Sequence, residues 1–262
     1  MANVANIEDF APLDDIPSAY GQVSHEEWET RVNLAACYRL VDLYDMSDMT
    51  RTHISAKIPK EEAFLLNPFG LMFNEITASS LIKIDIDGNV LSNSPYKINP
   101  AGYTIHSAVH AARKDINCVL HTHSVAGMAI SAIECGFLPI SQHAMRLYNR
   151  VAYHDYEGLA FDLDERERLA NDLGSHYCMV LRNHGLMSAG RTIDEAFSLI
   201  FYMEKCARSQ LQAMASGAKL IIPPDEVCDY AAKQFDKNVN ISVRDWPGHL
   251  RKLDAISPGF RE

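Results

Sequence analysis

Two histidines one residue apart are the first feature of the sequence that could carry out chemistry. The segment CVLHTHSVAG, residues 118–127, places His121 and His123 at the end of an apolar run, with small residues after them. If this run is a β-strand, residues i and i+2 point to the same face, about 7 Å apart. Two neutral imidazoles arranged in this way can bind one cation, such as zinc, iron, manganese or nickel. The pair therefore indicates either a metal site or polar residues packed for structural reasons.

A third histidine, His184, strengthens the metal interpretation. It lies in VLRNHGLMSAG, just after another short apolar run, and Gly185 follows it. A side chain at the end of a strand can reach a cleft, and glycine allows the backbone to turn tightly. Two strands of one sheet could supply three ligands and leave coordination positions open, which is typical of a catalytic metal. We predict a divalent metal bound by His121, His123 and His184.

The segments around these histidines alternate between helical and strand patterns. Ser24, with Glu27 three residues later, fits a capping box that opens a helix to about Tyr44. Alternating or short apolar runs predict strands at 52–58, 63–67, 80–91, 117–121 and 150–156, and a strand-to-turn unit at 178–185. The segment at 80–91 leads into a hairpin-type turn at Asp87-Gly88. Helical spacing and capping residues predict helices at 103–113, 125–135, 164–173, 192–216, 224–236 and 242–254. The pattern is mixed α/β, a sheet covered by helices. We expect one domain over residues 23–262, after an irregular arm at 1–22.

Composition and charge exclude several classes of partner. The net charge is −10, with 34 acidic against 24 basic residues, so we expect neither nucleic acid nor an anionic membrane as a partner. The 6 cysteines are scattered without a CxxC pair, which fits buried thiols in a reducing compartment. The N-terminal residues lack the basic start and apolar run of a signal peptide, and no apolar stretch approaches the roughly 20 residues that span a bilayer. We expect a cytoplasmic protein.

Consecutive long motifs resemble the class II aldolase/adducin family. They are NPAGYTIHSAVHAARKDINCVLHTHSVAGMAISAIECGFLPIS, VAYHDYEG and LRNHGLMSAG, and the resemblance covers roughly residues 25–220. It implies a three-layer α/β/α domain around a central, mostly antiparallel sheet, commonly in a homotetramer with sites between subunits. The family's sugar-phosphate aldolases bind zinc through an HxH pair and a later histidine, which match His121, His123 and His184. Zinc is the metal that the resemblance implies, and three imidazoles also suit iron or manganese.

The sequence departs from the aldolase pattern around this site. The resemblance places at Gly102 a carboxylate that takes part in proton transfer or metal binding in the aldolases, and glycine cannot act as an acid or base. The phosphate-binding positions correspond to Thr52-His53, Phe69-Gly70 and Pro100-Ala101, and only the glycine of the turn, Gly70, is kept. These changes disfavour sugar-phosphate cleavage. The altered motifs resemble the adducin-like branch, and the chain looks like a free-standing member, a group that includes decarboxylases and iron-dependent oxygenases of aromatic acids.

Other polar residues are candidates for the chemistry beside the metal. His106 lies about one helical turn beyond the missing carboxylate, and His53 replaces the family's phosphate-binding asparagine, so both are predicted catalytic residues. Asn67 and Gly70 are predicted to bind the substrate. Arg146, in SQHAMRLYN, suits an anionic small molecule through bidentate contacts. For the histidines and Asn67, the alternative role is a structural hydrogen bond.

The chemistry that remains is carbon–carbon bond cleavage. A three-histidine cation with open positions can chelate a 2-oxo, 2-hydroxy or ortho-hydroxy acid and stabilise an enolate-like intermediate. Decarboxylation and retro-aldol cleavage both pass through such a species, and decarboxylation needs no base to begin. We predict a metal-dependent lyase acting on a small carboxylate-bearing substrate. The alternatives are a non-haem iron oxygenase on the same three histidines and a non-catalytic, adducin-like binding protein.

Overall fold

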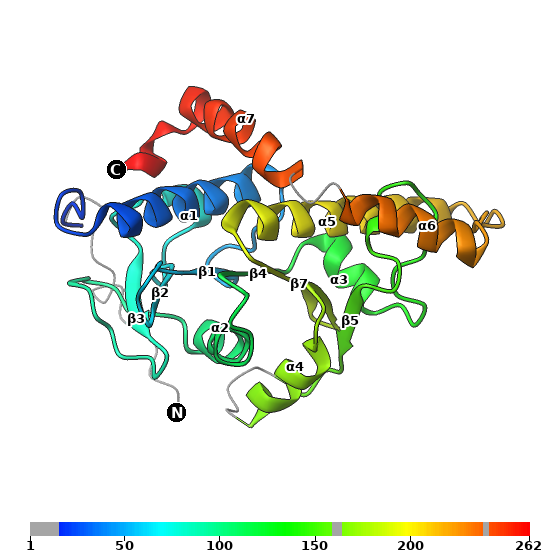
Figure 1. Cartoon of the computed structure of the whole chain (residues 1–262), viewed down its shortest axis with the longest axis horizontal. Coiled ribbons are helices and arrows are strands. Elements are labelled where there is room, and N and C mark those ends of the chain that lie inside the picture. The colour runs from blue at the N-terminus through cyan, green and yellow to red at the C-terminus, as the bar shows by residue number, and fades with distance from the viewer. Residues whose placement is uncertain (1–15, 159–163, 238–240) are drawn as a thin grey trace.

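A seven-stranded sheet forms the centre of the molecule (Figure 1). The computed structural model describes residues 16–158, 164–237 and 241–262. The strands are β1 (His53–Lys57), β2 (Ala63–Leu66), β3 (Ile82–Asp85), β4 (Cys118–Thr122), β5 (Val151–His154), β6 (Cys178–Leu181) and β7 (Gly185–Gly190). Their order is β3-β2-β1-β4-β7-β6-β5, and neighbours pair antiparallel except for the parallel pair β5 and β6. The predicted mostly antiparallel sheet is confirmed.

Helices cover both faces of this sheet and make a three-layer α/β/α arrangement, as predicted (Figure 1). One face carries α1 (His25–Leu43), α3 (Val125–Ser131) and α5 (Ile193–Ala215), and the other carries α2 (Pro100–Ala112) and α4 (Glu165–Leu173). Helix α7 (Ile241–Ile256) packs against α1 and α5, and α6 (Asp225–Asp236) packs against the short helix η4 (Ala144–Arg146). Two further short helices are η3 (Phe73–Glu75) and η5 (Pro258–Arg261). None of the described helices is both long and apolar enough to cross a membrane.

The side chains of β4 alternate between the two faces of the sheet. Leu120 belongs to the apolar cluster under α1 and α5, whereas Val119 belongs to the cluster under α2 and α4. Because the side-chain period of a strand is two, His121 points to the same side as Val119, toward α2. All five residues of β4 are buried. A polar imidazole in this strand therefore needs partners for both of its nitrogens.

Most predicted helices agree with the structure to within two residues, but α2 begins at Pro100 rather than at the predicted residue 103. The side chain of Ser24 accepts a hydrogen bond from the Glu27 N–H at 3.1 Å, at the start of α1 as predicted. The predicted helix at 125–135 ends earlier, at Ser131. Gly136, predicted as its cap, has a φ of 58° in a separate turn, where a Cβ would lie 2.1 Å from the Tyr153 hydroxyl oxygen. Close packing thus requires this glycine.

The predicted strand at 80–91 agrees with the structure in part. It is regular only over β3, and the predicted hairpin-type turn at Asp87-Gly88 is present: Gly88 has a φ of 87°, and a bridge joins Ile84 to Val90 beyond it. Of the predicted arm at 1–22, residues 1–15 lie outside the described part of the chain. Residues 16–22 contain no helix or strand.

Candidate metal centre

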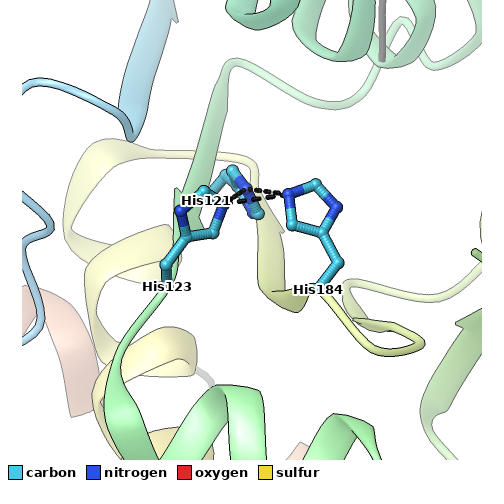
Figure 2. Close-up of side chains that lie close together, drawn as sticks. All are labelled: His121, His123 and His184. Carbon is cyan, nitrogen blue, oxygen red and sulfur yellow. Dashed lines mark hydrogen bonds between the residues drawn. The ribbon is translucent and has the colours of Figure 1, made fainter. Parts of the chain in front are cut away.

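Three histidine side chains converge at the end of β4 (Figure 2). The Nε2 atom of His121 lies 2.8 Å from that of His123 and 3.2 Å from that of His184, and 2.9 Å separates the last two. Nitrogens bound to a common zinc ion at about 2.0–2.1 Å lie roughly 3 Å apart. Within the described residues, this is the one group of histidine, cysteine and acidic side chains close enough to hold a metal ion. The fold thus brings together the three histidines that the sequence analysis selected.

The triad is built from the adjacent strands β4 and β7. His121 lies within β4, opposite His53 of β1, and His123 follows the strand directly. His184 ends the short turn between β6 and β7, in which Asn183 adopts a φ of 55°. Since β7 pairs antiparallel with β4, the start of β7 lies beside the end of β4. This pairing places His184 next to the HxH pair.

Gly185 permits this close approach of the two strands. A Cβ atom at this position would lie 2.3 Å from the backbone oxygen of Thr122 and 3.3 Å from the Cδ2 atom of His123. Real Cβ contacts to backbone oxygen are not this short, so any side chain would push β7 away from β4. The glycine of the NHG motif is thus a packing requirement of the triad.

Hydrogen bonds on the outer side of two rings fix which nitrogen faces the centre. The Nδ1–H of His121 donates to the Leu186 carbonyl at 3.0 Å, and the Nδ1–H of His123 donates to Asp48 Oδ2 at 3.0 Å. A carbonyl or carboxylate can only accept, so the proton of each ring resides on Nδ1 and the Nε2 lone pair is free. Such partners orient ligands and raise their basicity in metal sites. Both rings are therefore prepared to bind a cation through Nε2.

Burial favours the uncharged form of His121 and His184. It lowers the pKa of His121 well below the ordinary value, and the neighbouring histidines lower it further. Burial also lowers the pKa of His184, to about 4. Neutral imidazole is the form that binds a metal. The three donor atoms, their spacing and the lowered pKa values of these two rings thus fit a divalent cation.

His53 and His106, the two predicted catalytic residues, lie next to the triad. The ring centroid of His53 is 5.2 Å from that of His121, and its Nδ1 atom is 2.7 Å from Nε2 of His106. Both side chains are buried. His53 adjoins the triad, and His106 lies behind it on α2.

Gly102 packs directly against the His53 ring. A Cβ atom at residue 102 would lie 2.7 Å from Cδ2 and 2.8 Å from Cγ of His53. The imidazole therefore fills the space that a side chain at this position would need. The position that the resemblance assigns to a carboxylate is closed by a histidine from a neighbouring strand.

This contact predicts that Gly102→Ala displaces His53. In a helix, glycine to alanine normally stabilises by about 1 kcal/mol. Here we expect destabilisation by about 1–3 kcal/mol, the usual cost of overpacking. The matched control is Gly248→Ala in α7, where the new Cβ meets only Arg251 at 3.7 Å. Urea unfolding of both variants measures the difference, and a Gly102→Ala protein as stable as the control would contradict the contact.

A buried histidine behind the site predicts a loss of stability in acid. Burial lowers the pKa of His110 to about 3, whereas histidine in an unfolded chain titrates near 6.5. The unfolded state therefore binds more protons below pH 6.5, and stability falls from there down to about pH 3. At pH 5 the cost from His110 is about 2 kcal/mol relative to pH 7.5. Urea unfolding of metal-free protein at the two pH values should show His110→Gln losing about 2 kcal/mol less than the parent. Equal losses would contradict this.

Asn67 and Gly70, predicted to bind the substrate, lie in the segment after β2. The Oδ1 atom of Asn67 accepts a hydrogen bond from the Tyr38 hydroxyl at 2.8 Å, and its side chain is buried. Tyr38 belongs to α1, so this bond ties the segment to the helix layer opposite α2. Gly70 has a φ of 104°, which a turn with glycine adopts freely. Their role in substrate binding stays a prediction.

Arg146, the predicted anion-binding residue, lies between two aromatic rings. Its guanidinium is 4.1 Å from the ring centroid of Tyr202 on α5 and 4.8 Å from that of Phe235 on α6. These cation–π contacts provide it with a packing role. The structure groups Arg146 with α5 and α6, whereas the triad lies at the end of β4 and the start of β7. Its substrate role also stays a prediction.

Several residues at the site were not singled out from the sequence. Asp48 comes from the loop after α1, where no motif marks it, and Ser55 is one small residue within β1. Tyr156, from the motif VAYHDYEG, has its ring centroid 6.5 Å from that of His184 and is half-exposed. Strand alternation from His53 could have indicated Ser55, since the two share a face. Asp48 required the tertiary structure.

Sequence and structure comparisons define the class of protein. Residues 32–211 match the Class II Aldolase and Adducin N-terminal domain. The chain belongs to the class II aldolase and adducin family, as its motifs predicted.

Individual relatives include proteins from both branches of the family. A Caulobacter vibrioides protein, named as a candidate aldolase class 2 protein, is 49% identical over 248 residues, which cover 94% of this chain and 96% of that one. Rat (Rattus norvegicus) alpha-adducin is 40% identical over 211 residues, 78% of this chain but 28% of the adducin. The crystal structure of an aldolase II superfamily protein from Pseudomonas syringae has a TM-score of 0.88 and 45% identity, covering 94% of this chain and 100% of that one.

Proposed function

We propose that the protein is a metal-dependent lyase that cleaves a carbon–carbon bond of a small carboxylate-bearing substrate, by decarboxylation or retro-aldol cleavage. The observation that carries the proposal is the convergence of the Nε2 atoms of His121, His123 and His184, 2.8–3.2 Å apart. Membership of the class II aldolase and adducin family supports it.

The three histidines would hold the ion, for which we propose zinc. A divalent ion bound there would polarise the oxygen beside the substrate carboxylate and stabilise the negative charge that develops as the carbon–carbon bond breaks. Asp48 and the Leu186 carbonyl orient two of the rings. His53 adjoins the triad and is the residue that we assign to hydrogen bonding or proton exchange with the substrate. His106 positions His53 through the 2.7 Å contact.

The closed space at Gly102 favours decarboxylation over sugar-phosphate cleavage. A retro-aldol reaction needs a base to take a hydroxyl proton, and the carboxylate that serves in the aldolases has no equivalent at this position. Decarboxylation releases its electrons when the bond to the carboxylate breaks, so it needs an electron sink first and a proton afterwards. The His53 imidazole against Gly102 is our candidate to hold and orient the water that delivers this proton.

We further propose a homotetramer in the cytoplasm. The proposal of a tetramer is based on the family resemblance. The proposal of a cytoplasmic location is based on the six cysteines, all of which are free thiols, as is usual in a reducing compartment. We infer a small anionic substrate from the chelating geometry of the triad and not from the position of Arg146.

A second candidate function is an adducin-like binding protein without catalysis. The specific observation that favours it is the 40% identity to alpha-adducin across 78% of this chain. In this case the triad would be a remnant, and a stable protein partner would take the place of a substrate.

Metal content and anaerobic turnover test these functions. Purified protein should hold about one divalent ion per chain, measured by elemental analysis. It should also release carbon dioxide or an aldehyde from a panel of 2-oxo, 2-hydroxy and ortho-hydroxy acids without oxygen. Removal of the ion by a chelator should abolish turnover, and zinc should restore it. Turnover that requires oxygen would indicate the iron oxygenase instead. A purified protein that holds no metal ion and retains a stable protein partner in pull-down experiments would contradict the lyase proposal.

A further inference from the structure

A chain of four buried polar side chains begins beside the triad and leads away from it. His53 Nδ1 lies 2.7 Å from His106 Nε2, His106 Nδ1 lies 2.5 Å from Ser55 Oγ, and Ser55 Oγ lies 2.8 Å from His110 Nε2. The four side chains are at most 2% exposed. We refer to His53, His106, Ser55 and His110 as the histidine relay.

The relay arises from the side-chain periods of strand β1 and helix α2, which each place two of its residues on one face. His53 and Ser55 are two residues apart on β1, and His106 and His110 are four apart on α2, so each pair lies on one face of its element. Where α2 packs against the sheet, the two pairs interleave. The relay starts at the end of β1 that pairs with His121 and finishes at His110, which lines a groove of about 850 Å³ beside the other end of β1.

With its three rings neutral, the relay has only two possible arrangements of its protons, because each neighbouring pair of polar atoms lies at hydrogen-bond distance. Burial is consistent with neutral rings, since it lowers the pKa of His106 well below the ordinary value. A neutral imidazole has one N–H and one lone pair, and a hydroxyl both donates and accepts. Every hydrogen bond must therefore run in the same direction along the relay, either toward His53 or toward His110.

The surroundings of the far end favour one direction. Nδ1 of His110 is buried without a standard hydrogen bond among the described residues. Burial and the Lys57 charge lower the pKa of this ring, whereas an interaction with the backbone of Ile116 raises it, which is the effect of a hydrogen-bond acceptor. We place the proton that faces this acceptor on Nδ1, since Nε2 faces Ser55 Oγ at 2.8 Å. With the proton on Nδ1, Nε2 of His110 accepts from the Ser55 hydroxyl. Ser55 then accepts from His106 Nδ1–H, and His106 Nε2 accepts from His53 Nδ1–H.

We propose that Ser55 and His110 are positioning residues of the site, which fix His53 in the tautomer with the proton on Nδ1 and a bare Nε2. His53 would then meet a substrate as a hydrogen-bond acceptor for a hydroxyl or a water. This last step rests on the lyase proposal above, whereas the tautomer itself does not. Ser55 and His110 act through His106.

Nitrogen NMR of histidine-labelled protein tests the tautomer directly. In the parent protein, with and without zinc, the chemical shifts should report a protonated Nδ1 and an unprotonated Nε2 for His53. Ser55→Ala removes the acceptor of His106 Nδ1–H, so both His53 shifts should move toward the average of the two tautomers. Signals are assigned by their loss in His53→Asn.

A matched control and an activity readout separate positioning from packing. Ser188→Ala removes a buried hydroxyl on β7 that donates to the Ala196 carbonyl outside the relay, and it should leave the His53 shifts unchanged. Ser55→Ala should lower kcat roughly 10-fold to 100-fold, as the loss of a supporting hydrogen bond typically does. Zinc affinity and KM should stay within about twofold, since the triad keeps its own partners. Ser55→Thr, which retains the hydroxyl, should restore kcat.

The outcomes distinguish the relay from the lyase proposal. A protonated Nε2 on His53 in the parent protein would overturn the proposed direction. Unchanged His53 shifts in Ser55→Ala would overturn the role of Ser55. The expected shifts in a protein without lyase activity would support the relay and count against the proposed function.

Discussion

Replacing His184 with alanine is expected to remove the high-affinity metal site. The remaining pair, His121 and His123, offers two nitrogens 2.8 Å apart, whereas the intact site offers three. Removal of an outer hydrogen-bond partner typically costs 10–100-fold in metal affinity. Loss of a ligand should therefore cost more than about 100-fold. Competition between the protein and a chelator for zinc measures the affinity. The fold should persist, because His184 lies in a turn at the edge of the core.

Two further variants calibrate that result. His25→Ala removes an exposed histidine at the start of α1 and should leave zinc affinity unchanged. Asp48→Asn weakens the hydrogen bond from His123 Nδ1 but keeps all three ligands. Its loss of zinc affinity should therefore be smaller than that of His184→Ala, at roughly 10–100-fold. A His184→Ala protein that binds zinc as tightly as the parent would show that the ion is held elsewhere.

Gly185→Ala is expected to damage both the fold and the metal site. Its Cβ would lie 2.3 Å from the Thr122 backbone oxygen, and neither group is the flexible end of a side chain. The start of β7 must therefore move away from β4, which should cost about 3 kcal/mol or more of the free energy of unfolding. The same movement carries His184 away from the HxH pair. Urea unfolding and zinc competition on one sample of protein measure the two effects together.

The glycine in α7 again provides the comparison. Gly248→Ala has open space around its new Cβ, so it should leave zinc affinity close to that of the parent and raise the free energy of unfolding by at most about 1 kcal/mol. If Gly185→Ala behaved in the same way, the close approach of β4 and β7 would not be required for the site.

The candidate metal triad could be predicted from the sequence because two of its three histidines are close neighbours in the chain and the family motifs add the third. HxH in a strand fixes two ligands by the two-residue period, and Gly185 after His184 indicated a tight turn at a strand end. The class of fold followed from the alternation of helical and strand patterns and from the family motifs. Gly136 was mistaken for a helix cap because a cap and a close contact with Tyr153 both require glycine.

The remainder of the site depends on contacts between distant segments. The relay exists because β1 pairs with β4 in the register that sets His53 opposite His121, and because α2 lies across the same face. Neither the register nor the packing angle of a helix can be read from one sequence. Asp48 reaches His123 from a loop whose path depends on the end of α1.

The central place of the triad in the sheet has a consequence for the thermodynamics of ion binding. Its ligands project from β4, which has a paired strand on either side and no exposed residue, and from the turn into β7. Folding therefore restrains the ligand backbone before an ion arrives, and binding loses little further conformational entropy. Much of the favourable contact energy should then appear as affinity, and metal-free protein should remain folded, unlike small zinc domains whose core is the ion itself. Saturating zinc should add stability only by mass action, about 2.7 kcal/mol at a hundred times the dissociation constant.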